Sequence, residues 1–283
     1  SSSLYLALRQ VSSTRIIMRK SALIMAVFSA ANTIPVMASD TYDSAHKLSS
    51  RISLVSNYVL RGIEQTSSNP AVQGGMDYGH ASGWYAGLWG SPVSRITDSG
   101  ASDTAQYGSV STEIDLYFGY KNNFATDYGY DIGFIRYSYQ GNYTAAPGFA
   151  LADSAELYAA GRYRFLTIKY SCSILDQFMT VLDARGTNYI ELNASYPIPK
   201  TRYTLNAHIG RQTYTGTSAD ALGAMDRSPS YSDYRIGATA MVNSYELSVS
   251  FSNTNASTFY TYAQTLGGNW AGPVTVIALS HAF

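Results

Sequence analysis

The sequence predicts an all-β protein, a transmembrane antiparallel up-and-down β-barrel of about 12 strands with short periplasmic turns and longer extracellular loops. Three observations predict this fold. Short segments alternate apolar and polar residues, the connections between them alternate between short and long, and charged residues make up only 13% of the chain. Successive side chains of a strand point to opposite faces, so such segments separate lipid from water, and a closed barrel satisfies all of them at once.

The composition argues against a bundle of membrane helices. The mean hydropathy is −0.10, and the chain has no uninterrupted apolar run of about 18 residues. Its 25 tyrosines suit a barrel, because a phenol ring with a polar tip sits well at a membrane–water boundary. Tyrosine also suits ordinary strands, which is the alternative explanation.

The N-terminal region is typical of an exported protein. A basic start at Met18–Lys20, an apolar stretch at 22–31 and small residues before position 39 predict a signal peptide over 18–38. A short buried helix is the alternative. We interpret residues 1–17 as a non-native or upstream extension, residues 39–48 as a leader, and residues 49–283 as the outer-membrane barrel.

The charge balance excludes one class of partner. Four of the 19 basic residues and none of the 19 acidic residues precede position 39, which leaves 15 basic and 19 acidic residues and a net charge of −4. We therefore expect no nucleic-acid partner. The single cysteine, Cys172, cannot form an internal disulfide, and its neighbours predict a small side chain facing lipid.

The strands follow from the alternation. On the first strand, Ile52, Leu54, Tyr58 and Leu60 are expected on the lipid face. The twelve expected strands lie near 51–61, 71–79, 84–91, 112–121, 127–139, 155–163, 166–175, 187–196, 202–214, 231–242, 245–253 and 273–283.

Aromatic residues beside the tight turns predict a girdle at the periplasmic interface. In a soluble barrel they would simply be aromatic residues at hairpin ends. The expected girdle residues are Tyr78, Trp84, Tyr120, Tyr128, Tyr196, Tyr203 and Tyr245.

The inward positions collect charges of both signs, which must pair or keep ordered water in a narrow lumen. They predict a polar pore lining that tunes solute passage, or else a salt-bridged interior that fills the barrel. Barrels of about eight strands are filled by side chains, whereas barrels of 16 to 18 strands leave a wide channel. The pore-lining candidates are Arg61, Asp77, Glu113, Asp115, Lys169 and Glu191.

Catalysis is not expected. Of the four histidines only His208 points inward in mid-strand. A side chain on the lumen wall does not contact the lipid phase, so it could not act on a lipid ester there. The sequence has no G-x-S-x-G elbow, zinc-type histidine spacing or phosphate-cradling loop, so we predict no catalytic residues, no metal and no cofactor.

Several segments carry a family resemblance: NYVLRG at Asn57–Gly62, PAVQGGMDY at Pro70–Tyr78, GWYAGLWG at Gly83–Gly90 and EIDLYFGY at Glu113–Tyr120. They resemble the TorF-type porin family of Gram-negative bacteria, also known as the conserved family of unknown function Gcw_chp. The resemblance implies an outer-membrane location and a channel, and it supplies no catalytic or binding residues.

The C-terminal strand, which ends in Phe283, resembles the terminal strand that the outer-membrane assembly machinery recognises, although His281 departs from that pattern. This machinery, outer-membrane lipids and small hydrophilic solutes are the expected partners.

The predicted function is passive diffusion of small hydrophilic solutes through the outer membrane of a Gram-negative cell. The first alternative is a surface adhesion or interaction barrel that acts through its long loops near 92–111, 215–230 and 253–272. A secreted soluble β-protein and an outer-membrane enzyme with a reactive serine are the others.

Overall fold

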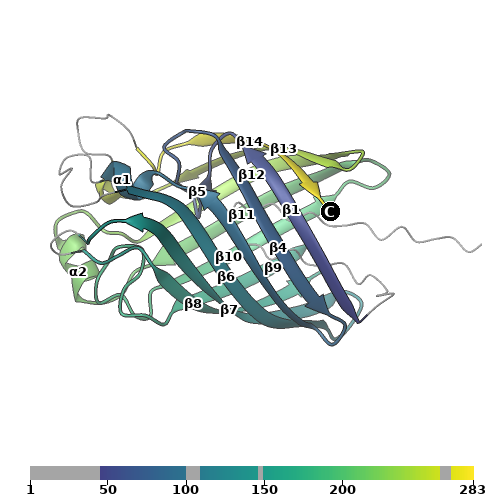
Figure 1. The fold of residues 1–283 in the computed structure, drawn as a ribbon, viewed down its shortest axis with the longest axis horizontal. Helices are drawn as coiled ribbons and strands as arrows, with labels where there is room; N and C mark the ends of the chain where they lie inside the picture. The colour runs from purple at the N-terminus through teal and green to yellow at the C-terminus, as the bar shows by residue number, and fades with distance from the viewer. Residues whose placement is uncertain (1–44, 100–108, 146–148, 262–268) are drawn as a thin grey trace, which may run out of the picture.

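Twelve strands form one closed antiparallel barrel, in which consecutive barrel strands pair and β1 also pairs with β14 (Figure 1). The computed structural model describes residues 45–99, 109–145, 149–261 and 269–283. The predicted closed barrel of about 12 strands is confirmed. The barrel strands are β1 (His46–Val55), β4 (Ala71–His80), β5 (Trp84–Pro92), β6 (Ser109–Asn123), β7 (Tyr128–Asn142), β8 (Ser154–Tyr163), β9 (Leu166–Ser173), β10 (Asn188–Pro197), β11 (Tyr203–Thr213), β12 (Tyr231–Val242), β13 (Tyr245–Thr254) and β14 (Val274–Ala282).

The two ends of the barrel differ in their connections, as the sequence predicts. At one end, here called the turn end, β8 and β9 are joined by Arg164 and Phe165, and β12 and β13 by Asn243 and Ser244. The opposite end, the loop end, carries the short helices α1 (Arg95–Ser99), α2 (Thr217–Ala224) and η1 (Thr258–Tyr260). Figure 1 shows α1 and α2 at one end and the C-terminus towards the other. Short turns face the periplasm in outer-membrane barrels, which assigns the turn end to that side.

The outside of the barrel is apolar and the inside is polar. On β6, Ile114, Leu116 and Phe118 are 37%, 53% and 54% exposed, whereas Glu113 and Asp115 between them are 0% and 1% exposed. This inversion is expected when lipid covers the outer face. No helix in the described ranges is long and apolar enough to cross a membrane.

The expected aromatic girdle lies on the outer surface near the turn end. Tyr120 packs edge to face against Trp84, with the ring centroids 5.3 Å apart. The other members are exposed: Tyr78, Trp84, Tyr128, Tyr196, Tyr203 and Tyr245.

The first strand ends earlier than predicted. β1 stops at Val55, and the chain then forms a separate two-stranded hairpin of β2 (Val59–Leu60) and β3 (Ile63–Glu64). The turn residues Arg61 and Gly62 have φ angles of +49° and +78°, and positive φ at both central residues is the signature of a two-residue type I′ hairpin turn.

The lipid-facing assignment of Tyr58 and Leu60 was therefore wrong, because the hairpin buries them to 0% and 5% exposure. Residues 56–70, here called the inner hairpin, connect β1 and β4.

Tyrosine rings lie against glycines on the inner wall. A Cβ added to Gly119 would lie 2.6 Å from Cζ of Tyr85 and from the backbone oxygen of Ile132, and Gly133 is crowded in the same way by Tyr158. The Tyr85 hydroxyl donates to Asp131 at 2.6 Å and contacts the Tyr158 hydroxyl. These glycines therefore leave the space in which the rings lie along the wall.

Other boundaries also differ from the prediction. β1 begins at His46, inside the region interpreted as a leader, and β6 and β7 each extend to 15 residues. Cys172 is half-buried and lies on the outward parity of β9. The predicted signal peptide and the extension at 1–17 lie outside the described residues.

Candidate functional site in the barrel lumen

The inner hairpin crosses the lumen and is anchored by its tip. The Arg61 guanidinium donates from Nη1 and Nη2 to Oε1 and Oε2 of Glu156 on β8, at 3.0 and 2.7 Å. Its Nη1 also donates to Oε1 of Gln212 on β11 at 2.8 Å, and its Cζ lies 4.3 Å from the Tyr189 ring centroid on β10. β8 and β10 are each the fifth strand from β1 around the ring, in opposite directions. Arg61 thus reaches the part of the wall that lies opposite β1, the strand that leads into the inner hairpin.

The base of the inner hairpin is held by its own polar side chains. Asn57 donates to Oε2 of Glu64 at 2.7 Å and accepts from the Thr66 hydroxyl at 3.0 Å. The Thr66 oxygen also accepts the backbone N–H of Tyr58 at 3.0 Å. From the neighbouring loop, Nε of Arg95 donates to Oε1 of Gln65 at 3.1 Å. These buried bonds give the hairpin a fixed shape.

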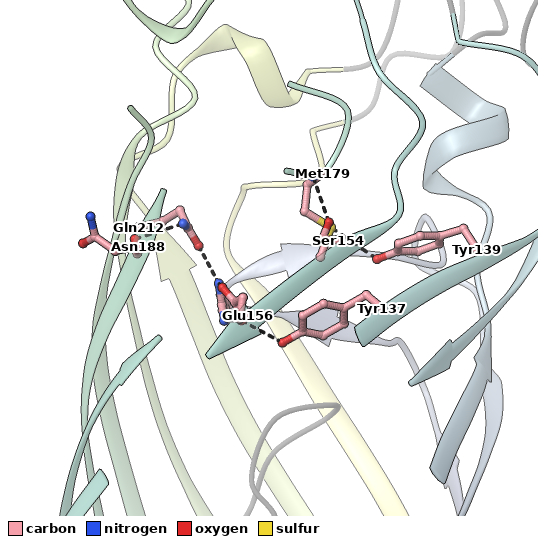
Figure 2. Close-up of polar contacts among 8 residues, drawn as sticks. Tyr137, Tyr139, Ser154, Glu156, Met179, Asn188 and Gln212 are labelled. Carbon is pink, nitrogen blue, oxygen red and sulfur yellow. Dashed lines mark hydrogen bonds and ion pairs between the residues drawn. The ribbon is translucent and has the colours of Figure 1, made fainter. Parts of the chain in front are cut away.

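Glu156 sits at the centre of the anchor. The Tyr137 hydroxyl donates to its Oε2 at 3.1 Å, and Figure 2 shows both side chains with Gln212 in the barrel interior. The side chains of Arg61 and Glu156 are 7% and 0% exposed. A buried carboxylate with a bidentate guanidinium partner is well satisfied, so the anchor holds the hairpin across the lumen.

A cavity lies between the hairpin tip and the wall. His208 Nε2 is 2.9 Å from Asp233 Oδ1, and the Tyr189 hydroxyl donates to Asp233 Oδ2 at 2.7 Å. Charges of both signs face this space. It is lined by Val59, Leu60, Arg61, Gly62, Tyr189, Glu191, His208, Asp233, Arg235 and Ser252.

A second group of charges is buried without partners. Within the described residues, neither the carboxylate oxygens of Glu113 and Asp115 nor the Tyr58 hydroxyl has a hydrogen-bond partner. On β6, Asp115 pairs in register with Trp89 and Tyr137. Tyr58 packs edge to face on Trp89, with ring centroids 5.3 Å apart.

The Tyr58 hydroxyl stays protonated. Burial, and then the charges of Glu113 and Asp115, raise the pKa of this hydroxyl well above its usual range. It is therefore a neutral oxygen beside two acidic groups.

Towards the turn end the inward side chains have separate partners. Asp77 on β4 accepts from the Tyr117 hydroxyl at 2.6 Å, and the Lys169 Nζ lies 4.4 Å from the Tyr158 ring centroid. Asp77 and Lys169 are only half-buried, which indicates a wetter compartment than the level of Glu113.

The structure thus places the six predicted pore-lining residues in three groups. Glu113 and Asp115 lie together, Arg61 and Glu191 border the same cavity, and Asp77 and Lys169 contact other residues. Arg61 belongs to the inner hairpin and not to the barrel wall. Whether these residues line a conducting pore stays a prediction.

Sequence reasoning missed the partners of Arg61. Glu156 has inward parity and an acidic side chain, so its position was visible in the pattern, but its pairing was not. Gln212 and Tyr58 gave no signal, because their roles depend on the path of the inner hairpin. In the described part of the chain, no group of three or more His, Cys, Asp or Glu side chains could hold a metal ion.

A family model, described as a bacterial protein of unknown function (Gcw_chp), matches residues 39–283. The chain belongs to the Gcw_chp family. The predicted family membership is confirmed. A comparison with curated proteins found no match.

Comparison with solved structures finds distant likenesses between this Gcw_chp protein and porins. The KdgM porin has 11% identity and a TM-score of 0.48, covering 83% of this chain and 98% of its own. The NanC porin has 8% identity and a TM-score of 0.46, covering 84% and 99%. The P. putida toluene transporter TodX has 10% identity and a TM-score of 0.45, covering 84% and 89%.

The Gcw_chp protein is an outer-membrane β-barrel. Its closed ring leaves no strand edge unpaired, and every barrel strand exposes large apolar side chains. Among sheets, only a closed one can cross hydrocarbon with every backbone group satisfied.

Proposed function

We propose that this protein is a channel for passive diffusion of small hydrophilic solutes across the outer membrane, and that the inner hairpin sets its width. One observation carries the proposal: a polar lumen is crossed by a hairpin whose tip is attached to the far wall by the side chain of Arg61. A filled structural barrel would not need an ion pair where apolar packing would serve, since buried ion pairs add little net stability.

The attachment allows two states of the lumen. With the hairpin docked, Tyr137, Glu156 and Gln212 are at most 1% exposed, so protein atoms rather than water cover the wall at this level. With the tip released, the lumen would approach the width of an unobstructed 12-strand barrel, between the filled eight-strand and wide 16-strand types. Solutes would then be selected by size and by the charges on the wall, with no catalytic step.

Conductance tests the proposal. Purified, folded protein in planar bilayers should give stepwise current, and its Glu156→Gln variant should give larger or longer steps because the hairpin loses its anchor. Vesicles that contain the protein should also admit small sugars faster than large ones. Folded protein that is silent in bilayers, both as wild type and as Glu156→Gln, would overturn the channel.

The predicted signal peptide and the predicted recognition of Phe283 by the assembly machinery remain predictions. In the structure, the Phe283 backbone N–H donates to the Ser50 oxygen at 2.9 Å, which ties this residue to β1.

A further inference from the structure

Unsatisfied polar atoms gather at one place in the lumen. Seven buried side-chain nitrogen and oxygen atoms of the described residues have no hydrogen-bond partner, and five of them belong to Tyr58, Glu113 and Asp115. Buried polar groups are nearly always satisfied, and an orphaned group calls for a water, an ion or a proton. We propose that Glu113, Asp115 and Tyr58 bind a metal cation, and that calcium is the best match.

The other buried acids inside the barrel have partners among the described residues. Glu156 pairs with Arg61, Asp233 accepts from Tyr189, and Glu191 accepts from Asn193 at 2.8 Å. Glu113 and Asp115 differ from these, because within the described residues neither carboxylate has an ion pair or a hydrogen bond of good geometry, although the Tyr58 and Tyr139 hydroxyls lie near Glu113.

Arg95 does not fill this gap. It influences Glu113 electrostatically, but its Nε is bonded to Gln65 and it forms no ion pair with either carboxylate. Two adjacent, buried carboxylates cost several kcal/mol each when left uncompensated, so a positive charge beside them is strongly favoured.

The ligand chemistry points to a hard cation. The site offers four carboxylate oxygens and one phenol oxygen, with two negative charges if both acids are ionised. Calcium prefers oxygen ligands and accepts irregular geometry, whereas magnesium needs near-octahedral geometry and keeps its waters. Soft or borderline metals would favour His or Cys ligands, and this site has neither.

The proposed site joins two elements of the fold. Glu113 and Asp115 belong to the wall strand β6, and Tyr58 belongs to the inner hairpin. An ion there would tie the base of the hairpin to the wall, as Arg61 ties its tip. With two acidic ligands, the site has one fewer than the three-residue groups considered above. The Tyr58 hydroxyl would be its third protein ligand, and water would supply the rest of the six to eight oxygens that calcium takes. Binding requires only the folded barrel and is independent of whether the barrel conducts.

Terbium luminescence tests the site, because Tb³⁺ replaces Ca²⁺ and is excited through nearby aromatic rings. The full chain would be refolded in neutral detergent micelles, since anionic lipids bind divalent cations themselves. We expect saturable Tb³⁺ emission that Ca²⁺ displaces, and equilibrium dialysis should give about one Ca²⁺ per barrel, as a single coordination site requires.

Matched variants separate the site from the rest of the lumen. Glu113→Gln with Asp115→Asn should weaken Ca²⁺ binding by tenfold or more, roughly the loss expected when both charged ligands become neutral. Asp77→Asn, a lumen carboxylate bonded to Tyr117, should leave binding unchanged. Trp89→Phe should reduce the emission excited through tryptophan while keeping the Ca²⁺ affinity.

Two results would overturn the proposal. Wild-type protein without saturable Ca²⁺ binding would mean that a proton shared by the two carboxylates neutralises them. Unchanged binding in the double variant would place the ion elsewhere. Should the double variant fail to fold, Tyr58→Phe decides the matter, because it removes only the hydroxyl and should still weaken binding.

Discussion

Arg61 and Glu156 form the ion pair that joins the tip of the inner hairpin to the far wall of the barrel, with N···O distances of 3.0 and 2.7 Å. The two residues are 95 positions apart in the sequence. Removing one partner of a buried ion pair typically costs about 3–5 kcal/mol, because the other charge is left uncompensated. A free-energy change of about 1.4 kcal/mol changes the ratio of two populations tenfold. The docked state of the hairpin therefore depends strongly on this pair.

Glu156→Gln should loosen the hairpin and increase conductance. The buried Arg61 loses its counter-charge, so the open population should rise by about 100-fold or more for a loss of about 3 kcal/mol. Single-channel recording measures the open fraction and the step size. Asp153→Asn is the matched control, because its partner Arg136 is 44% exposed and the pair lies outside the lumen anchor. Equal currents from both variants would contradict the anchoring role.

Neutralising the acid pair should change ion selectivity. Glu113→Gln with Asp115→Asn removes up to two negative charges from the narrow part of the lumen. About 1 kcal/mol of lost attraction would lower the cation-to-anion permeability ratio roughly fivefold. The reversal potential in a KCl gradient with a chelator present measures this ratio. A ratio equal to that of the wild type would mean that permeating ions do not pass near this pair.

Gly119→Ala should destabilise the barrel. The added methyl would lie 2.6 Å from both Tyr85 Cζ and the backbone oxygen of Ile132, so the strand and the ring must both move. Overpacking of this kind costs about 1–3 kcal/mol, measured by urea unfolding in detergent. Gly161→Ala is the control, because its methyl would meet only Ile168 Cγ2, at 3.8 Å. A stable Gly119→Ala barrel would show that the Tyr85 ring does not need this space.

Val249→Arg should weaken insertion into bilayers. Val249 is 47% exposed near the middle of β13, and its in-register neighbours are Ala238 and Ile277, so lipid should cover it. An arginine facing lipid near the membrane centre costs about 2–4 kcal/mol, which the free energy of unfolding in vesicles would reveal. Leu182, 36% exposed between β9 and β10, lies outside the barrel wall, so Leu182→Arg should cost little. Equal effects of the two changes would contradict a lipid-covered band at Val249.

The alternation along β6 shows why the barrel could be predicted. Residues Glu113 to Phe118 alternate strictly, and the strand period of two assigns each side chain to the lumen or to lipid without further information. The same argument places Asp77, Lys169 and Glu191 on the inner wall.

The inner hairpin could not be predicted in the same way. Residues Asn57 to Arg61 continue the alternation of the first strand, so the period alone extends that strand too far. The break depends on Arg61 taking a positive φ, which is uncommon for arginine and becomes favourable once its side chain meets Glu156. A contact across 95 positions depends on the path of the loop, which no local pattern encodes.

Cys172 offers a direct view of how this barrel sits in its surroundings. It is the single cysteine of the chain and lies half-buried on the outward parity of β9. A thiol-reactive fluorophore would therefore attach at one known position without any engineered residue. Quenching of that fluorophore by brominated acyl chains would measure the immersion depth of β9 and fix the vertical position of the whole ring.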